Sequence, residues 1–198
     1  MKKIFILVWT LILFFSCKKE EKSDITNDCV VEEQITSDYD KFYINYPGPQ
    51  KKGYAKAIKI NKEWKASASA KILNSILAIK FETFNTEEED NKGYETEIVD
   101  INVLIPKIGC TILGNNKTEL ISEIYFSAVR GDATQNAYIV DTNKHNKLSI
   151  DTFDLINNRV AGKFMFSIKK SRIRQSDPWY NPDELRIFNG EFHCNIID

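Results

Sequence analysis

From residue 54 onward, hydrophobic and polar residues alternate with a period of two, and no long window shows the 3.6-residue period of an amphipathic helix. The alternation is clearest in "RVAGKFMFSI" (159–168) and "LRIFNGEFHCNII" (185–197). In "AIKINKEWKAS" (57–67), Ile58 and Ile60 are apolar positions, and the pattern is interrupted at "NK". This segment predicts either two strands joined by a tight turn or one bent strand.

Six further segments between these regions have the length and composition of short strands. They are "SILAIKFETF" (75–84), "TEIVDINVLI" (96–105), "KIGCTIL" (107–113), "LISEIYFSAV" (120–129), "NAYIVDT" (136–142) and "KLSIDTFDL" (147–155). Glycine, asparagine and aspartate separate them, as is typical of turns. The pattern predicts an all-β domain, either an antiparallel β-sandwich or a partly closed barrel.

The first residues have a different character. Lys2 and Lys3 precede an apolar stretch, 4–15, which is shorter than the roughly 20 residues of a spanning helix. A basic start, an apolar core and a small residue, Ser16, before Cys17 predict a secretory signal peptide over 1–16. The arrangement resembles a bacterial lipoprotein signal, in which the cysteine becomes the lipidated first residue. The alternative is an ordinary secretory signal with an incidental cysteine.

The residues after Cys17 are polar. The sequence "KKEE" (18–21) resembles the lipoprotein export signal of Bacteroidetes, which directs lipoproteins to the outer face of the outer membrane. The alternative is that these charges only keep the chain solvated. Residues 17–38 are expected to form a lipidated cysteine and a flexible tether, followed by a single all-β domain over 39–198.

Charge adds one exclusion. Removal of residues 1–16 takes away Lys2 and Lys3, leaving 25 basic residues against 28 acidic ones, a net charge of −3. A weakly acidic surface offers no electrostatic attraction for nucleic acid. The membrane is expected to be reached through the lipid anchor alone.

Several short segments carry a resemblance to a known family. They are "INKEWKA", "IPKIGCTILG", "NAYIV", "LSIDTFD", "VAGKFMFSI" and "IFNGEFHCNI". Together they resemble a domain of unknown function found in Bacteroidetes lipoproteins, over roughly 54–197. The resemblance implies a β-sandwich-like fold and a place in the cell envelope, and no activity. We expect Trp64 to pack in the core and Gly162 and Gly190 to permit a bulge or close backbone approach.

The cysteines permit one prediction about covalent structure. Cys110 and Cys194 each lie on the apolar parity of a predicted strand, so both are expected to face the core. In an oxidising envelope the two would form a disulfide if their Cα atoms came within about 7 Å. The preferred interpretation is that both are small buried hydrophobic residues, because the sequence cannot give connectivity.

Residues for catalysis are sparse. His145 and His193 are the two histidines, and no metal-ligand spacing, nucleophile elbow or phosphate-binding glycine loop is present. The acidic run "EEED" (87–90) and the tripeptide "RGD" (130–132) are expected to lie in turns. No cofactor, metal or catalytic residue is predicted.

One loop carries the features of a binding site. "SDPWYNPDE" presents Trp179 and Tyr180 between two prolines, a rigid aromatic pair suited to stacking on a sugar or peptide. The alternative is that this loop covers one end of the fold. The sequence favours a non-catalytic surface module that binds glycan or protein. The alternatives are a structural or accessory subunit of an envelope complex and, with less support, a hydrolase.

Overall fold

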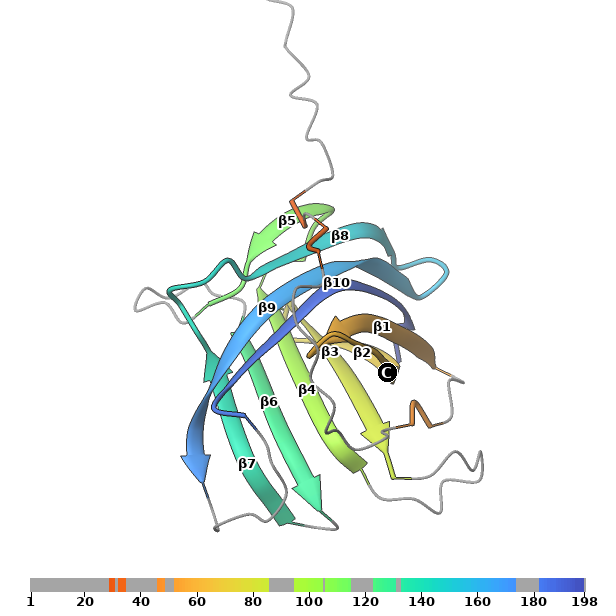
Figure 1. Ribbon diagram of the computed structural model, residues 1–198. Coiled ribbons are helices and arrows are strands. Elements are labelled where there is room, and N and C mark those ends of the chain that lie inside the picture. Colours follow the sequence, from red (N-terminus) through yellow and green to blue (C-terminus); the bar gives the residue numbers. More distant parts are fainter. Residues whose placement is uncertain are drawn as a thin grey trace, which may run out of the picture.

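The computed structural model describes residues 29–30, 32–34, 46–48, 52–85, 95–104, 106–114, 123–130, 133–173 and 182–197. Within these ranges the chain forms ten β-strands and no helix (Figure 1), which confirms the predicted all-β class. The strands are β1 (Gly53–Lys59), β2 (Lys62–Leu73), β3 (Ile76–Phe84), β4 (Glu95–Leu104), β5 (Gly109–Ile112), β6 (Glu123–Arg130), β7 (Ala133–Val140), β8 (Lys147–Asp154), β9 (Arg159–Ile173) and β10 (Glu184–Asn195).

Eight of these strands close into an antiparallel barrel. Their order is β10-β1-β2-β3-β4-β6-β7-β9, and pairing of β9 with β10 completes the ring. β8 and β5 extend the sheet from β9 outside this ring, so β5 is its terminal strand. Closure satisfies the backbone hydrogen bonds of strands that would otherwise be sheet edges. Of the two predicted architectures, the barrel is therefore correct.

β9 forms the junction between the ring and its extension. Its first half pairs with β8 up to Met165, and its second half pairs with β7 from Ile168 onward. The side chain of Asn146 fills the gap between these partners. Its amide nitrogen donates to the carbonyl oxygens of Asp141 and Lys144, and its Oδ1 accepts from Ser167 N at 2.7 Å. This buried amide therefore replaces the ladder bonds lost where the chain leaves the ring.

The hairpins explain the breaks in the hydrophobic pattern. Ile60 and Asn61 both have positive φ, as do Asn74 and Ser75 between β2 and β3. Two-residue turns with positive φ at both positions match the twist of paired strands. The interruption at "NK" is therefore a tight turn, as one reading of the sequence predicted, and β1 and β2 are separate strands.

The barrel interior is filled by large apolar side chains. Phe164 lies near its centre, with its ring centroid 5.0 Å from that of Phe81 and 5.8 Å from that of Phe166. A Cβ atom at Gly190 would overlap the Phe164 ring, and one at Gly162 would overlap the carbonyl oxygen of Ser149. Both glycines therefore permit the close approach that the sequence predicted.

In two strands, the residues that face the barrel interior are not the ones that the hydrophobic pattern indicates. In β1 the buried positions are Ala55 and Ala57, while Ile58 lies on the outer face. In β5, Cys110 and Ile112 are exposed instead of facing the core. The small alanines fit inward because large aromatic rings fill the interior beside them. β5 lies outside the ring, so its alternation has no core to face.

The N-terminal segment covers the outer face of β1, β9 and β10. Val30 is buried there in a small apolar cluster that also contains Cys29, Ile58, Met165 and Phe188. The backbone of Glu33 exchanges two hydrogen bonds with the Asn189 side chain, and its carboxylate pairs with Arg186. The prediction of a flexible tether over 17–38 is therefore wrong for residues 29–30 and 32–34, because side-chain contacts hold them on the barrel.

Candidate functional site

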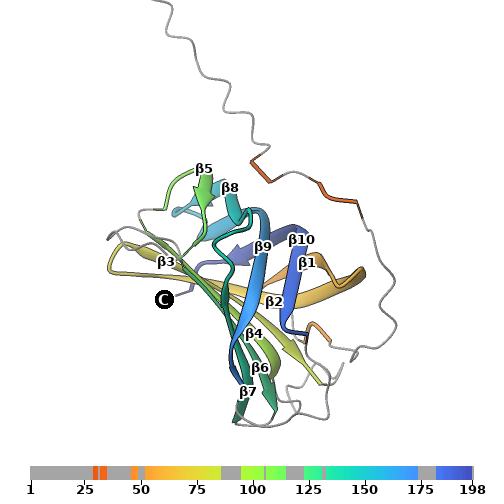
Figure 2. The same cartoon turned by 60° about the vertical axis from the view of Figure 1, so that its left-hand side comes forward.

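The two ends of the barrel differ, and each is named here by its connections. The loop end carries the connections β1–β2, β3–β4, β6–β7 and β9–β10, and the arrowheads of β3, β6 and β9 point toward it in Figure 1. The tethered end carries the β2–β3 and β8–β9 hairpins, β5 and the described C-terminal residues 196–197. Figure 2 shows β5, β8 and the C-terminus on this side of the molecule.

A buried ion pair lies at the loop end. Lys59, the last residue of β1, pairs through Nζ with Oε1 of Glu97 near the start of β4. Their side chains are only 12% and 11% exposed. Trp64 Nε1 donates to the other carboxylate oxygen at 2.8 Å, and Lys59 Nζ lies 6.0 Å from the centre of the Phe126 ring. Residues from β1, β2 and β4 therefore meet in one charged cluster, defined as Lys59, Trp64 and Glu97, beside Phe126 of β6.

The geometry of this cluster is costly unless each charge keeps its partner. Two ions removed from water lose several kcal/mol of solvation each, and their attraction offsets the loss only when hydrogen bonds complete the arrangement. Trp64 supplies such a bond while its indole packs edge-on against Phe81 and Phe164. The expectation that Trp64 packs in the core is therefore confirmed. Its polar edge, which sequence reasoning did not use, faces the charged cluster.

Asn136 on β7 is a second buried polar residue at this end. Asn136 is 2% exposed, and among the described residues neither its amide nitrogen nor its amide oxygen has a hydrogen-bond partner. Cα pairing places Glu97 beside Ala128 and Ala128 beside Asn136, so Asn136 lies two strands from the charged cluster. A buried amide without partners costs about 1–3 kcal/mol. Such groups in native proteins call for a specific explanation.

The residue that follows Lys59 adds backbone strain. Ile60 has a φ of 51°, in the left-handed region that β-branched residues rarely adopt. Its side chain nevertheless packs against the core. Backbone strain of this kind costs of the order of 1–3 kcal/mol and clusters at functional sites. The loop end therefore combines three costly features: a buried ion pair, an unpartnered amide and a strained turn.

The predicted aromatic pair, Trp179 and Tyr180, lies outside the described residues. It belongs to the connection between β9 and β10, and both strands reach the loop end. Pro182, the first described residue after it, accepts a hydrogen bond from the buried hydroxyl of Tyr138 at 3.0 Å. The acidic run 87–90 and residues 131–132 of "RGD" also lie outside the described part.

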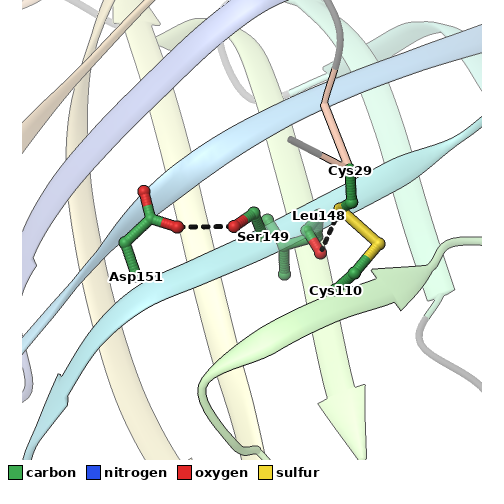
Figure 3. Close-up of a disulfide and its surroundings, with 5 residues drawn as sticks. All are labelled: Cys29, Cys110, Leu148, Ser149 and Asp151. Atoms are coloured by element: carbon green, nitrogen blue, oxygen red, sulfur yellow. Dashed lines mark hydrogen bonds between the residues drawn. A yellow bond between two sulfur atoms is a disulfide. The ribbon is translucent and has the colours of Figure 1, made fainter. Parts of the chain in front are cut away.

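The disulfide differs from the predicted pair. Cys110 is bonded to Cys29, with their Cα atoms 5.8 Å apart (Figure 3). Cys194 is a free, buried thiol. The candidate Cys110–Cys194 disulfide is therefore wrong. Cys110 lies on the outer strand β5, whereas Cys194 points into the barrel from β10. The expectation of a buried, unpaired cysteine is confirmed for Cys194 alone.

The disulfide and the free thiol also differ in their surroundings. Cys29 Sγ lies 3.8 Å from the carbonyl oxygen of Leu148, a contact only, because a disulfide sulfur carries no hydrogen to donate. Ser149, the next residue of β8, donates a hydrogen bond to Asp151 at 2.5 Å. Burial raises the pKa of the Cys194 thiol to about 12, so it is neutral at physiological pH.

The histidines are not brought together. His145 is exposed, and its carbonyl oxygen accepts a hydrogen bond from Arg186. His193 is exposed on β10 and packs against the Tyr54 ring at 5.1 Å. Among the described residues, no group of three or more His, Cys, Asp or Glu side chains has the geometry of a metal site. The same residues contain no helix with the length and hydropathy of a membrane span.

Comparison with known proteins gave no match to any family model, curated protein or solved structure.

Three residues of the loop end, Lys59, Glu97 and Asn136, were missed by sequence reasoning, although the sequence carried a signal for two of them. Glu97 shares the parity of Val99 and Ile101 in its strand, and Asn136 shares that of Tyr138 and Val140. A polar residue on the inward parity of a strand must find a partner or accept a penalty. A search for polar residues on the inward parity would therefore have selected Glu97 and Asn136. Lys59 would have been missed, because Ile58 seemed to define the inward parity of β1.

Proposed function

We propose that this protein is a lipid-anchored protein of the outer membrane, similar in kind to the Bacteroidetes lipoproteins, with a non-catalytic barrel that binds glycan or protein. The signal over 1–16 is removed, Cys17 carries the lipid, and the loop end of the barrel faces the ligand. Trp179 and Tyr180 supply the stacking surface.

The observation that carries the proposal is the opposition of the two ends. The disulfide of Cys110 fixes the N-terminal segment at the tethered end. The charged cluster and the unpartnered amide of Asn136 lie at the other end, which carries the β3–β4 and β9–β10 connections. A barrel mouth with a few converging polar groups is a usual place for a ligand. Side chains that present both donors and acceptors suit the hydroxyl or amide groups of a sugar or peptide.

The orientation is tested by protease treatment of intact cells, with detection of the barrel before and after. We expect the barrel to be digested on intact cells, while the Cys17→Ala variant is protected until the cells are lysed. Protection of the unaltered protein on intact cells, followed by digestion after lysis, would place the barrel in the periplasm and contradict the surface assignment.

Binding is tested by probing glycan and peptide arrays with the mature chain. We expect binding to fall about tenfold or more when Trp179 and Tyr180 are both changed to alanine, because aromatic anchors dominate interface energetics. The control is Ile112→Ala, which alters an exposed residue at the opposite end. Equal loss in both variants would contradict the assignment of the binding end.

A second candidate function is that of an accessory subunit in an envelope complex. It is supported by β5, which among the described strands pairs with β8 alone and ends the sheet order, with no described strand on its other edge. Open edges accept strands from other chains. Photo-crosslinking from position 112 in intact cells would favour this function if it gave one discrete protein adduct that is lost when the neighbouring Thr111 is changed to proline.

A further inference from the structure

Every large hydrophobic side chain that the described part of the chain leaves exposed lies at the tethered end. These residues, called the apolar rim, are Ile72, Leu73, Ile108, Ile112, Leu155 and Ile156. Ile112 is 76% exposed and Ile156 is 93% exposed. Single exposed hydrophobic residues are ordinary, but their confinement to one end of a barrel is not.

The three parts of the apolar rim belong to neighbouring connections. Ile72 and Leu73 end β2, and the first residue of β3, Ile76, pairs with Leu104, four residues before Ile108. On the other side, Ile197 N donates to the carbonyl oxygen of Ala70, and Ile196 N donates to that of Asn158. The C-terminal residues therefore join the β2–β3 hairpin to the β8–β9 hairpin, which carries Leu155 and Ile156.

Local hydrogen bonds hold one tip of the rim in its exposed position. The carboxylate of Asp154 accepts bonds from the backbone nitrogens of Ile156 and Asn157 at 2.9 and 3.0 Å. Asn157 also donates through its side chain to Asp154 Oδ2 at 2.6 Å. These polar bonds brace the β8–β9 turn, and the Ile156 side chain points into solvent.

The tether ends at the same place. Cys29 is bonded to Cys110 on β5, the strand that also carries Ile112 and follows Ile108 directly. Twelve residue steps separate Cys17 from Cys29, a span of about 40 Å when fully extended and about 20 Å for a relaxed chain. A lipid on Cys17 would therefore keep the apolar rim within a short distance of the bilayer surface.

We propose that the tethered end of the barrel rests on the lipid surface, with the apolar rim inserted among the lipid headgroups and upper acyl chains. This inference rests on the proposed lipid anchor at Cys17. The rim consists of two hairpin tips and the separate strand β5 with the residue before it, which suits a fluid surface better than a shaped protein partner. Lys71 and Lys107 are exposed beside Ile72 and Ile108, where they would meet anionic headgroups.

The test uses the mature chain with Cys17→Ser, which removes the anchor, and vesicles of phosphatidylethanolamine and phosphatidylglycerol. We expect measurable binding in a flotation assay, reduced at least about tenfold by Ile112→Asp or Ile156→Asp, since a charge at an inserted position is strongly unfavourable. The matched control is Thr134→Asp, which adds the same charge at an exposed position of the loop end and is expected to bind as the parent does. Equal binding of all four chains overturns the proposal.

Analytical sedimentation of the same chains tests whether a second copy of the chain, instead of lipid, covers the apolar rim. If the parent chain dimerises, binds no vesicles, and loses the dimer on Ile156→Asp, the apolar rim is an interface between copies and the lipid assignment is wrong.

The anchor is tested by labelling cells with an alkyne fatty acid. Labelling that is lost in Cys17→Ala, with rim variants that bind vesicles as the parent does, refutes the rim and retains the anchor. Rim-dependent vesicle binding without labelling refutes the anchor alone.

Discussion

The loop end of the barrel buries charged side chains, whereas the tethered end exposes apolar ones. At the loop end, Lys59 and Glu97 are enclosed by the barrel wall, while at the tethered end Ile112 and Ile156 point into solvent. The ion pair on the outer wall, Arg186 with Glu33, is 27% and 34% exposed, so water still reaches it. The difference teaches that burial of charge and exposure of apolar surface are separated by position in this fold.

The largest expected effect comes from removing one member of the buried pair. Glu97→Ala leaves Lys59 without its partner and Trp64 Nε1 without its acceptor, so we expect the free energy of unfolding to fall by about 3–5 kcal/mol. The measurement is urea denaturation followed by tryptophan fluorescence. The control, Glu33→Ala, removes a partly exposed pair and is expected to cost about 1 kcal/mol or less. Equal costs for the two variants would remove the distinction between the buried and exposed pairs.

The next effect concerns the bond that holds the N-terminal segment at the tethered end. Cys110→Ser opens a disulfide that joins residues 81 positions apart, and we expect a loss of about 2–4 kcal/mol of unfolding free energy. The unaltered protein should lose the same amount when reductant is added, whereas the variant should not respond. A protein whose urea midpoint is insensitive to reductant would show that the bond does not stabilise the fold.

A smaller effect, of opposite sign, is expected at Asn136. Asn136→Leu replaces an amide without partners by an apolar side chain of similar size, so unfolding free energy should be unchanged or rise by about 1 kcal/mol. The same change at Asn146 removes three hydrogen bonds at the β7–β8 junction and should cost about 2–3 kcal/mol. Thermal unfolding of the two variants measures the contrast. A destabilised Asn136→Leu protein would mean that this amide has a partner in the folded chain.

The smallest effect is that of the free thiol at the tethered end. Burial raises the pKa of Cys194 from 9.0 to about 12, so between these values the unfolded thiol ionises while the folded one does not. Its contribution to stability is therefore complete below pH 9 and declines as the pH rises above it. Stability measured from pH 7 to pH 11 should fall more steeply for the unaltered protein than for Cys194→Ala. Native protein should also resist iodoacetamide at pH 8.

Much of the secondary structure was predictable from particular residues. The alternation in "RVAGKFMFSI" and "LRIFNGEFHCNII" corresponds to β9 and β10, and the interruption at Asn61 marks the β1–β2 turn. The candidate site was less accessible. Glu97 and Asn136 lie on inward parities, but which polar residue finds a partner depends on strands far away in the sequence. Trp179 and Tyr180 remain a prediction, since they lie outside the described residues.

The inward face of a strand was predictable only where apolar residues cover one of its faces and solvent covers the other. In β1 the sequence marks Ile58 as an apolar position, yet the structure turns Ala55 and Ala57 inward and covers Ile58 with Val30 from the N-terminal segment. β5 was assigned a buried face, yet it lies outside the ring. In both strands the hydrophobic residues alternate as the sequence indicates, but the pattern carries no information on what covers them.

The sequence by itself determined the strands, the turns and the all-β class, because alternation and turn chemistry act between residues that are close along the chain. Only the tertiary structure decided that β9 pairs with β10 to close the ring, that Cys29 and not Cys194 meets Cys110, and that Lys59 meets Glu97. Those contacts join residues tens of positions apart. They exist because closure of the barrel brings distant strands to the same end, and no local pattern encodes that meeting.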